Sequence, residues 1–378
     1  MNQAFFWCYP WDLADEGYER ALTRLVGEIG VDAVSVAATT HRVRSFRPRL
    51  TEGPRTVSYD AAAHFQPSGR CYANTQLRPT AAAWMKTRNP LEKIARLAEQ
   101  NAIKLRVWTV CCQHDTLSAR HPMATRVDVF GDRFDGWLCP SNPDVREYVA
   151  ALAEDLTTNY PVETIELEAM DFDMADRRVE LGIDSHPIGR ALMDWCFCSS
   201  CRQRAMDAGV DTASVKASAL SHLDRAFRLE PPAFGSFELL LANDTHLAGY
   251  QKMRIDAVTS LVQMVRSRTS ARLMVHRNGR SKHGGADPSA LAAHCDGFLL
   301  PWAHGRVQSD DTEDDRSKVE VRINCCPPHM KDGPSLVTQV HQASQAGHPA
   351  IGFHHYGMTP EPCLDWIRQA IRYARREA

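Results

Sequence analysis

Three cysteines within six residues are the first group in this sequence whose types and spacing could do chemistry. Twelve cysteines in 378 residues are far fewer than a disulfide scaffold carries, and clustered cysteines in a reducing compartment more often bind a metal. Tetrahedral zinc needs four thiolate or imidazole ligands, so a fourth ligand must come from elsewhere in the fold. The stretch CFCSSC contributes Cys196, Cys198 and Cys201.

Eight short apolar runs predict the elements that must position such ligands. They alternate with longer stretches in which apolar residues recur every three to four positions, a pattern typical of parallel strands joined by helices. Eight such units favour an α/β fold, the (β/α)₈ barrel, whose functional groups gather at the carboxyl ends of the strands. A doubly wound open sheet is the alternative, but no G-x-G-x-x-G follows the first run. The runs are residues 4–9, 31–38, 103–112, 164–170, 271–276, 295–302, 318–324 and 349–356.

Long segments follow three of the predicted strands. Residues 41–88 follow the second strand, residues 113–142 the third and residues 171–200 the fourth. Loops of this length in a compact domain are usually functional. We therefore expect a single barrel domain over residues 1–378, with these segments as loop insertions.

The alternation of side chains along a strand assigns a direction to the acids. In TIELEAM the apolar residues suit the helix side, so Glu166 and Glu168 point into the barrel. Because a charge inside a barrel is costly unless it is paired, we expect Glu166 to pair with Arg106 and Glu320 with Arg322. Glu168 lies at the open rim, where catalytic groups belong, and is the candidate catalytic acid.

The ends of the other strands carry polar, aromatic and histidine side chains. Such a set predicts a polar pocket with aromatic walls, because hydroxyl groups need many donors and acceptors and sugar faces stack on aromatic rings. The expected partner is a small-molecule carbohydrate. The candidate binding residues are Trp11, His114, His276, Asn278, Trp302, Arg322, Asn324, His354 and Tyr356, and Asp12, His41, His304 and His355 lie at the same strand ends.

The barrel also offers a fourth zinc ligand. Cys139 stands near the end of the long segment after the third strand, and adjacent barrel loops can share a metal. Cys111 and Cys112 are weaker candidates because they belong to a predicted strand. We therefore expect Cys139 to complete a structural Zn²⁺ site with the three clustered cysteines.

Composition and charge indicate no further partner. The formal net charge is -2, with 44% hydrophobic and 24% charged residues, which is ordinary globular composition without a bias toward nucleic acid or membrane. No apolar stretch approaches the ~20 residues of a membrane helix, and the first residues lack the pattern of a secretion signal. We expect a cytoplasmic protein. The sequence is compatible with a monomer or with a homo-oligomer.

A series of motifs lies between residues 139 and 210. In chain order they are Cys139-Pro140, Asn142-Pro143, Arg146-Glu147, Asn159-Tyr160, a strand ending in Glu168, Cys196-x-Cys198-x-x-Cys201 and Arg202. This order resembles family 42 glycoside hydrolases, which are (β/α)₈ β-galactosidases with a structural zinc held by a CPN-type segment and a later C-x-C-x-x-C. The resemblance implies the same zinc ligands here, and it implies that Glu168 is the general acid/base of glycoside cleavage.

Two positions depart from the family pattern. The family has Asn-Glu at the end of the fourth strand, where this chain has Leu167-Glu168, and its nucleophilic Glu ends the seventh strand, where this chain reads INCCPPH. A second carboxylate must come from elsewhere, and a base acting on water inverts the anomeric centre when the two carboxyl groups lie roughly 6.5–9.5 Å apart. We expect a divergent relative that cleaves a small or unusual glycoside. The candidates for the second acid are Asp115, Asp171, Asp173 and Glu320.

Two other functions fit the same barrel. A divalent-metal-dependent sugar isomerase, epimerase or lyase would bind its ion through His276, His354, Glu168 and Asp115, because imidazole and carboxylate ligands leave positions open for substrate hydroxyls. The sequence has no H-E-x-x-H motif to support it. A non-catalytic carbohydrate-binding barrel would account for the missing acid on the seventh strand.

Overall fold

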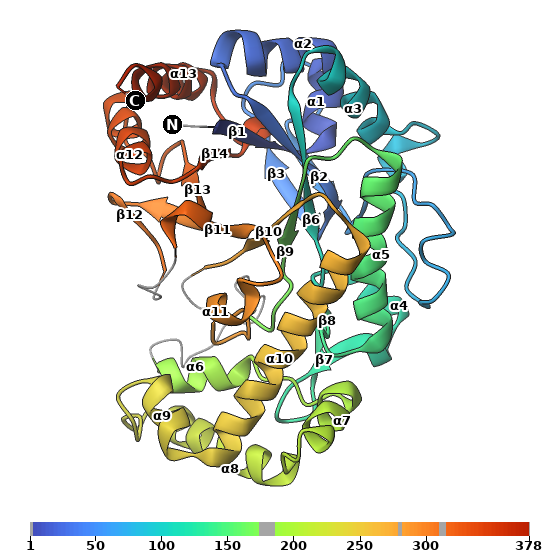
Figure 1. Ribbon diagram of the computed structural model, residues 1–378, viewed down its shortest axis with the longest axis vertical. Coiled ribbons are helices and arrows are strands. Elements are labelled where there is room, and N and C mark those ends of the chain that lie inside the picture. The colour runs from blue at the N-terminus through green and yellow to red at the C-terminus, as the bar shows by residue number, and fades with distance from the viewer. Residues whose placement is uncertain (1–2, 174–185, 279–281, 310–314, 378) are drawn as a thin grey trace.

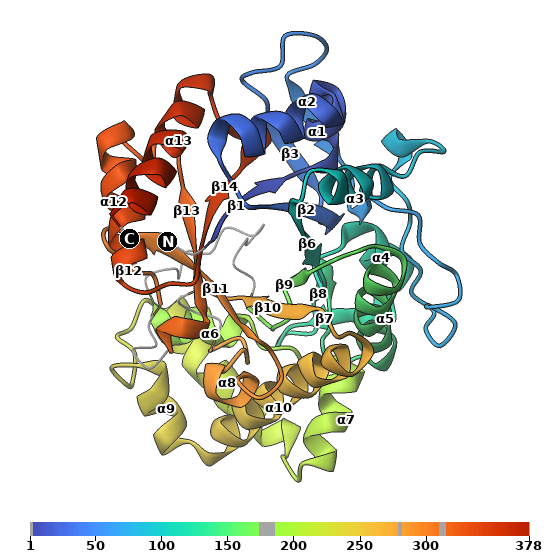
Figure 2. The same ribbon diagram turned by 45° about the horizontal axis from the view of Figure 1, so that its top comes forward.

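Eight parallel strands form a closed ring in the computed structural model, which describes residues 3–173, 186–278, 282–309 and 315–377. Strand β1 pairs with both β2 and β14, and the other neighbours follow chain order around the ring, with helices outside it (Figures 1 and 2). The predicted (β/α)₈ barrel is confirmed. Its strands are β1 Gln3–Cys8, β2 Ala33–Thr40, β6 Lys104–Val110, β9 Thr164–Glu168, β10 Arg272–His276, β11 Gly297–Ala303, β13 Val319–Asn324 and β14 Ala350–His354.

Helices outside the ring carry the chain from one strand to the next. Several begin at a polar cap followed by proline, whose fixed φ suits the first helical turn. At the start of α5, for example, the side chain of Asn142 accepts a hydrogen bond from the N–H of Val145. Among the described residues, no helix is long and apolar enough to cross a membrane. The helices of this layer are α1 Pro10–Glu16, α2 Tyr18–Thr23, η1 Arg24–Ile29, α3 Pro90–Gln100, α5 Pro143–Asn159, α10 Thr245–Arg268, α11 Pro288–Leu291, α12 Gly333–Gln345 and α13 Glu361–Arg376.

The long segments after β2, β6 and β9 have structure of their own. The first contains the hairpin β3 Val43–Phe46 and β4 Thr56–Tyr59, then β5 Ala62–Ala63 and η2 Ala83–Met85. The second contains α4 Asp115–Arg120, η3 Pro122–Ala124, β7 Thr125–Val127 and β8 Arg133–Leu138. The third runs past residue 200, with residues 174–185 outside the described part of the chain, and contains α6 Pro187–Met193, α7 Ser199–Asp207, α8 Thr212–Phe227 and α9 Phe237–Asn243.

Two apolar clusters separate the inside of the barrel from the outside. The larger one lies between strands and helices and includes Leu105, Ile165 and Leu167. The smaller one fills the interior and includes Trp7 and Trp108. The predicted alternation along the strands is therefore confirmed. The polar side chains that point inward form two groups, one deep in the barrel and one at its rim.

Candidate functional site

Deep in the barrel, one arginine lies between two glutamates. Arg106 donates from Nε to Oε1 of Glu166 and from Nη2 to Oε2 of Glu320, each at 2.6 Å. Trp7 donates from Nε1 to Glu166 at 2.7 Å, and Arg272 pairs with Glu320. We call Arg106, Glu166, Glu320 and Arg272 the barrel floor.

The floor confirms one predicted ion pair and corrects the other. Glu166 pairs with Arg106 as expected, but the pairing of Glu320 with Arg322 is wrong because Glu320 binds Arg106 and Arg272 instead. Arg322 stands two residues further along the same strand, about 6.6 Å nearer the rim.

Glu166 is held as a carboxylate by its neighbours. Burial by itself raises the pKa of Glu166. The charge of Arg106 and the hydrogen bonds from His276 and Arg106 outweigh this effect and lower the pKa to about 2. The ring Nε2 of His276 lies 3.3 Å from Glu166, so this candidate binding residue contacts the floor.

Above the floor, four side chains surround the rim end of β9. Trp108 donates from Nε1 to Oε2 of Glu168, which is half-buried. Burial lowers the pKa of Arg322, while the negative charge of Glu168 counteracts that effect. The ring of His354 lies 6.4 Å from that of Trp108. We call Glu168, Trp108, Arg322 and His354 the barrel mouth.

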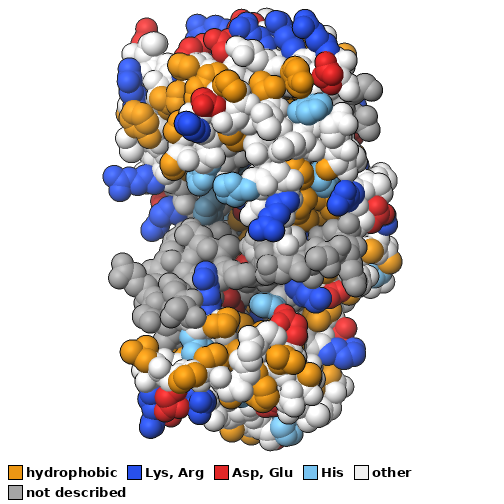
Figure 3. All heavy atoms as spheres, turned by 90° about the vertical axis from the view of Figure 1, so that its left-hand side faces the viewer, with side chains coloured by type: hydrophobic (Ala, Val, Ile, Leu, Met, Phe, Trp, Pro, Cys, Tyr) orange, Lys and Arg blue, Asp and Glu red, His pale blue; other side chains and the backbone are white. Residues whose placement is uncertain are grey.

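The surroundings of His354 in the mouth favour its neutral form. Burial lowers the pKa of His354 well below its ordinary value, and electrostatic interactions with His355 and Arg322 act in the same direction. Asn324 follows Arg322 by two residues on β13 and pairs in register with His354, so it lies at the same rim. Figure 3 shows histidine side chains gathered along a hollow on one face of the molecule.

Two aspartates follow Glu168 in the chain and pack against the segment after β10. Asp173 accepts a hydrogen bond from Nδ2 of Asn278 at 2.8 Å, and its own N–H donates to Oδ1 of Asp171 at 3.0 Å. A Cβ at Gly284 would lie 2.5 Å from the backbone N of Asp173, so this approach requires glycine. Burial raises the pKa of Asp171 to about 8, and the charge of Asp173 adds to the rise.

Asp115, the other candidate acid, lies between the segments after β2 and β6. Its Oδ2 accepts a hydrogen bond from the backbone N of Arg42 at 3.2 Å, and a Cβ at Gly136 would lie 2.9 Å from its Oδ1. The structure therefore places Asp115 in the loop layer, whereas Asp173 continues directly from the strand of Glu168.

A row of aromatic rings leads outward from the mouth. The ring of Trp108 lies 5.6 Å from Tyr9, Tyr9 stacks on Trp11 at 4.4 Å, and Trp11 lies 4.5 Å from Tyr59. Trp84 lies 6.4 Å from Tyr59, and both rings are half-buried. We call these five residues the aromatic row. Only Trp11 was among the candidate binding residues, although the segment of residues 41–88 was expected to be functional.

The structure also places an acid next to an imidazole beside this row. Oδ2 of Asp12 lies 3.7 Å from Nδ1 of His355, and both side chains are buried. Burial raises the pKa of Asp12 to about 7, although the charges of Arg47 and Arg49 act against it. His355 packs 4.1 Å from Tyr9. Strand parity did not select this pair, and its only signal in the sequence is its position after the first and last strands.

Three candidate binding residues do not join the mouth. Trp302 belongs to the outer apolar cluster and packs 5.4 Å from His348. Tyr356 belongs to the same cluster and donates its hydroxyl to Glu16 at 2.7 Å. His114 is buried and caps α4, accepting a hydrogen bond at Nδ1 from a backbone N–H. For Trp302 the reason is parity, because it shares the outward face of β11 with Leu300.

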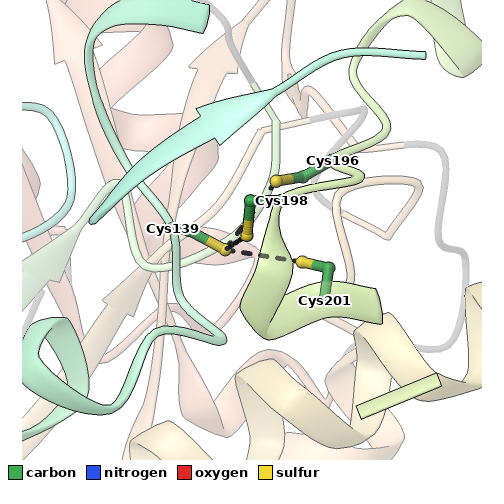
Figure 4. A group of neighbouring side chains, drawn as sticks. All are labelled: Cys139, Cys196, Cys198 and Cys201. Carbon is green, nitrogen blue, oxygen red and sulfur yellow. Dashed lines mark hydrogen bonds between the residues drawn. The ribbon is translucent and has the colours of Figure 1, made fainter. Parts of the chain in front are cut away.

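The four predicted cysteine ligands come together in one buried cluster. Their Sγ atoms all lie within 4.8 Å of one another, and Figure 4 shows them pointing toward a common centre. From Cys139 the Sγ distances are 3.4 Å to Cys201, 3.5 Å to Cys198 and 3.8 Å to Cys196. A tetrahedral ion with ligand bonds of 2.3 Å would separate its sulfur ligands by about 3.8 Å. The cluster therefore fits a metal ion.

The surroundings of the cluster disfavour thiolates unless a cation is bound. Burial raises the pKa of Cys139 and of Cys201, so a bound cation would be needed to keep them deprotonated. The backbone N–H of Val127 donates to Sγ of Cys196 at 3.4 Å. All twelve cysteines of the chain are free thiols, which argues against the disulfide interpretation of CFCSSC.

No protein-family model matches the chain, and no curated protein matches it. Solved structures do resemble it. The PgaB (BpsB) glycoside hydrolase domain from Bordetella bronchiseptica is 11% identical with a TM-score of 0.57, over 98% of this chain and 99% of that one. The α-L-fucosidase isoenzyme 2 from Paenibacillus thiaminolyticus is 12% identical with a TM-score of 0.56, over 100% of this chain and 50% of that one.

A β-galactosidase from Halorubrum lacusprofundi is similar at the same level, with 13% identity and a TM-score of 0.56, over 98% of this chain and 58% of that one. The chain thus spans about half the length of the fucosidase and under two thirds of this β-galactosidase. At this identity the likeness establishes the fold alone. The chain has the (β/α)₈ barrel fold found in these glycoside hydrolases.

Proposed function

We propose that this protein is a glycoside hydrolase that cleaves a small or unusual glycoside, with Glu168 as general acid/base. The observation that carries the proposal is the position of Glu168, which points inward at the rim of β9, is half-buried and accepts a hydrogen bond from Trp108. Catalytic carboxylates of (β/α)₈ barrels lie at such strand ends. The fold shared with solved glycoside hydrolases supports the same class of reaction.

The reaction needs two proton transfers. Protonated Glu168 gives its proton to the glycosidic oxygen while the bond from that oxygen to the anomeric carbon breaks. A water molecule attacks the anomeric carbon and gives a proton to a second carboxylate. The products are the free sugar and the alcohol, and solvent returns the two carboxyl groups to their starting protonation states.

Asp173 is the proposed second carboxylate. It follows Glu168 by five residues, and Asn278 holds its Oδ2 at 2.8 Å. Asp115 is the alternative; it accepts a hydrogen bond from the loop after β2 and lies against Gly136 in the segment after β6. Strand β13 ends at Asn324, so no acid stands where family 42 enzymes carry their nucleophile, and we expect inversion rather than retention.

The proposed substrate site combines the mouth with the aromatic row. Arg322, His354 and Asn324 would donate hydrogen bonds to sugar hydroxyls from the ends of β13 and β14, and His276 and Asn278 would do so from the end of β10. Tyr59 and Trp84, with part of each ring exposed, would stack on a sugar face. Trp11 supports this wall from beneath Tyr59.

The cysteine cluster would hold a structural Zn²⁺. Cys139 follows β8, and the other three ligands precede or begin α7, so the ion would tie together the segments after β6 and β9. Four thiolates leave no open coordination position, so the proposed reaction does not involve the ion. This ligand set is the feature that resembles family 42 glycoside hydrolases.

A panel of nitrophenyl glycosides tests the proposal. The wild-type protein should hydrolyse at least one member, and Glu168→Gln should lower kcat by about 10²–10⁴-fold, the usual contribution of a general acid. Glu163→Gln is the matched control, because Glu163 is exposed and directly precedes the first residue of the same strand, at the end opposite Glu168. Full activity in Glu168→Gln would refute the assignment.

Chelation separates the hydrolase from the metal-dependent alternative. Among the described residues, the four cysteines are the one group arranged to hold a metal, and His276, His354, Glu168 and Asp115 do not form such a group. We expect glycoside cleavage to persist after brief treatment with a mild chelator. Loss of activity that Mn²⁺ or Mg²⁺ restores would instead indicate a sugar isomerase, epimerase or lyase.

A further inference from the structure

A cavity of about 840 Å³ lies beside the cysteine cluster, where the starts of α5 and α7 meet the side of α10. Its volume is in the range of sites for small molecules. Residues from three separate segments line it, among them Ser141 before α5, Ser199 and Ser200 in α7, and Met253 in α10. It is distinct from the mouth, because none of its lining residues belongs to the mouth or the aromatic row.

Two arginines line this cavity without a carboxylate partner among the described residues. Arg146 donates only to neutral acceptors, the carbonyl oxygens of Pro140 and Ala257 and the hydroxyl of Ser260. No hydrogen bond or ion pair of the Arg204 guanidinium is found within the described part of the chain. Burial lowers the pKa of Arg146 to about 10, and the positive charge of Arg204 lowers it as well. Two uncompensated cations therefore face one space.

A second cavity of comparable size shows the contrast. It measures about 590 Å³ and lies beside α1 and α13. Its arginines Arg24, Arg47 and Arg49 each form an ion pair with an aspartate or glutamate. Three of the four arginines in that cavity are thus paired with acids, and the fourth, Arg20, is exposed to solvent, whereas Arg146 and Arg204 are half-buried and have no acid partner among the described residues.

A buried hydroxyl gives a second, independent sign of a ligand. The side chain of Ser141 is in contact with the cavity, the residue is 3% exposed, and its Oγ has no hydrogen-bond partner. A buried hydroxyl without a partner costs free energy that a ligand could recover. The first turn of α7 adds N–H groups, because Cys198 at its N-cap makes no side-chain capping bond.

Two acids also line the cavity, and each has a partner of its own. Asp207 accepts a hydrogen bond from Gln203 at 2.9 Å, and Asp256 pairs with Lys252 at 2.9 Å. Both acids are exposed at the outer edge. The half-buried part of the cavity, which contains Arg146 and Arg204, is therefore positively charged and can attract an anion.

We propose that this cavity binds the phosphate or sulfate group of a small ligand, with Arg146 and Arg204 as its charged contacts and Ser141 as a hydroxyl donor. Planar guanidinium groups match the geometry of these tetrahedral oxyanions. The cysteine cluster supports the site, since Ser141 stands two residues after Cys139 and the two serines of α7 lie between Cys198 and Cys201. The proposal does not depend on the reaction at the mouth.

Calorimetric titration of the full chain in a phosphate-free buffer tests this site. Inorganic phosphate, sulfate and glycerol 3-phosphate are titrated separately, with glycerol as the uncharged control. We expect saturable binding of at least one oxyanion at one site and none of glycerol. The strongest of the three ligands indicates whether the site prefers a free ion or a monoester.

Substitutions on one helix give a matched comparison. Arg204→Gln should weaken binding about tenfold, because a charge-assisted hydrogen bond is lost. Arg202→Gln removes the same charge from an exposed position of α7 that does not line the cavity, and it should bind as the wild type does. Ser141→Ala should weaken binding while the Tm without ligand stays unchanged or rises.

Two results would overturn the proposal. One is the absence of saturable binding of all three oxyanions at concentrations up to about 10 mM, which lies above the dissociation constant expected for a specific site. The other is equal weakening by Arg204→Gln and Arg202→Gln, which would indicate a general charge effect. Glycoside hydrolysis is measured in the same variants and should be unchanged. A failure of the anion site can then be told apart from a failure of the proposed enzymatic function.

Discussion

Glu166 and Glu168 stand two residues apart on β9, and both point into the barrel. Glu166 lies in the floor, where Arg106, Trp7 and His276 contact its carboxylate. Glu168 lies in the mouth, where Trp108 donates to it and Arg322 is a nearby charge. The same residue type on the same strand thus has two different surroundings.

The two regions differ in how their charges are compensated. In the floor, Arg106 lies between two carboxylates at 2.6 Å. In the mouth, no carboxylate of the described residues forms an ion pair with Arg322, although this side chain is largely removed from water. A compensated group contributes to folding, whereas an uncompensated one is available to a ligand. The comparison predicts that substitutions in the floor change stability and those in the mouth change activity.

The largest expected effect on stability comes from the floor. Glu166→Gln should lower the free energy of unfolding by about 3–5 kcal/mol, because it breaks a buried ion pair and leaves Arg106 poorly compensated. Glu168→Gln should change it by less than about 1 kcal/mol, as neutral polar substitutions near the surface do. Urea denaturation at pH 7 measures both. Equal losses in the two variants would remove the distinction between floor and mouth.

Protonation of Glu166 should contribute to the loss of stability at acid pH. The folded pKa of Glu166 is about 2, below its ordinary value of 4.5, so its contribution is fully present above pH 4.5 and is lost as the pH falls toward 2. The linkage amounts to about 3 kcal/mol. Unfolding free energies measured between pH 6 and pH 2 should show this loss in the wild type and a shallower one in Glu166→Gln. Parallel curves would contradict the assigned pKa.

A smaller effect is expected from the arginine of the mouth. Arg322→Met should lower kcat/KM about tenfold, near 1.4 kcal/mol, by removing a donor to substrate. Its free energy of unfolding should stay constant or rise, because the cost of burying a charge that has no ion-pair partner among the described residues disappears. The matched control is Arg272→Met in the floor, which should reduce stability by loss of the pair with Glu320. If Arg322→Met reduced stability and Arg272→Met reduced only activity, the roles assigned to the two arginines would be wrong.

The smallest effect is expected at the outer end of the aromatic row. Trp84→Ala should raise KM about fivefold with kcat unchanged, since stacking on an aromatic ring is worth about 1 kcal/mol. Trp84→Phe keeps a ring and should retain most of the affinity. Initial rates over a range of substrate concentrations separate the two constants. A fall in kcat with an unchanged KM would show that Trp84 does not act through sugar stacking.

The prediction from sequence was most complete where the signal is local. All eight apolar runs correspond to barrel strands, because the periods of strands and helices are written in consecutive residues. Parity along TIELEAM correctly separated the inward acids from Leu167. The four cysteines predicted to bind a metal, including distant Cys139, also came together as expected, since the motif names three of them and the barrel order brings the fourth loop alongside.

Only the tertiary structure decided which side chains meet. Strand parity places Glu320 inside the barrel, but the stagger of neighbouring strands determines that its partner is Arg106 and not Arg322. In the same way, the folding of the long segment after β2 brings Tyr59 and Trp84 beside Trp11. The sequence by itself determined the barrel, the inward acids and the cysteines of the buried cluster, because these follow from short local patterns. The partners of each charge depend on contacts between residues far apart in the chain, which no local pattern records.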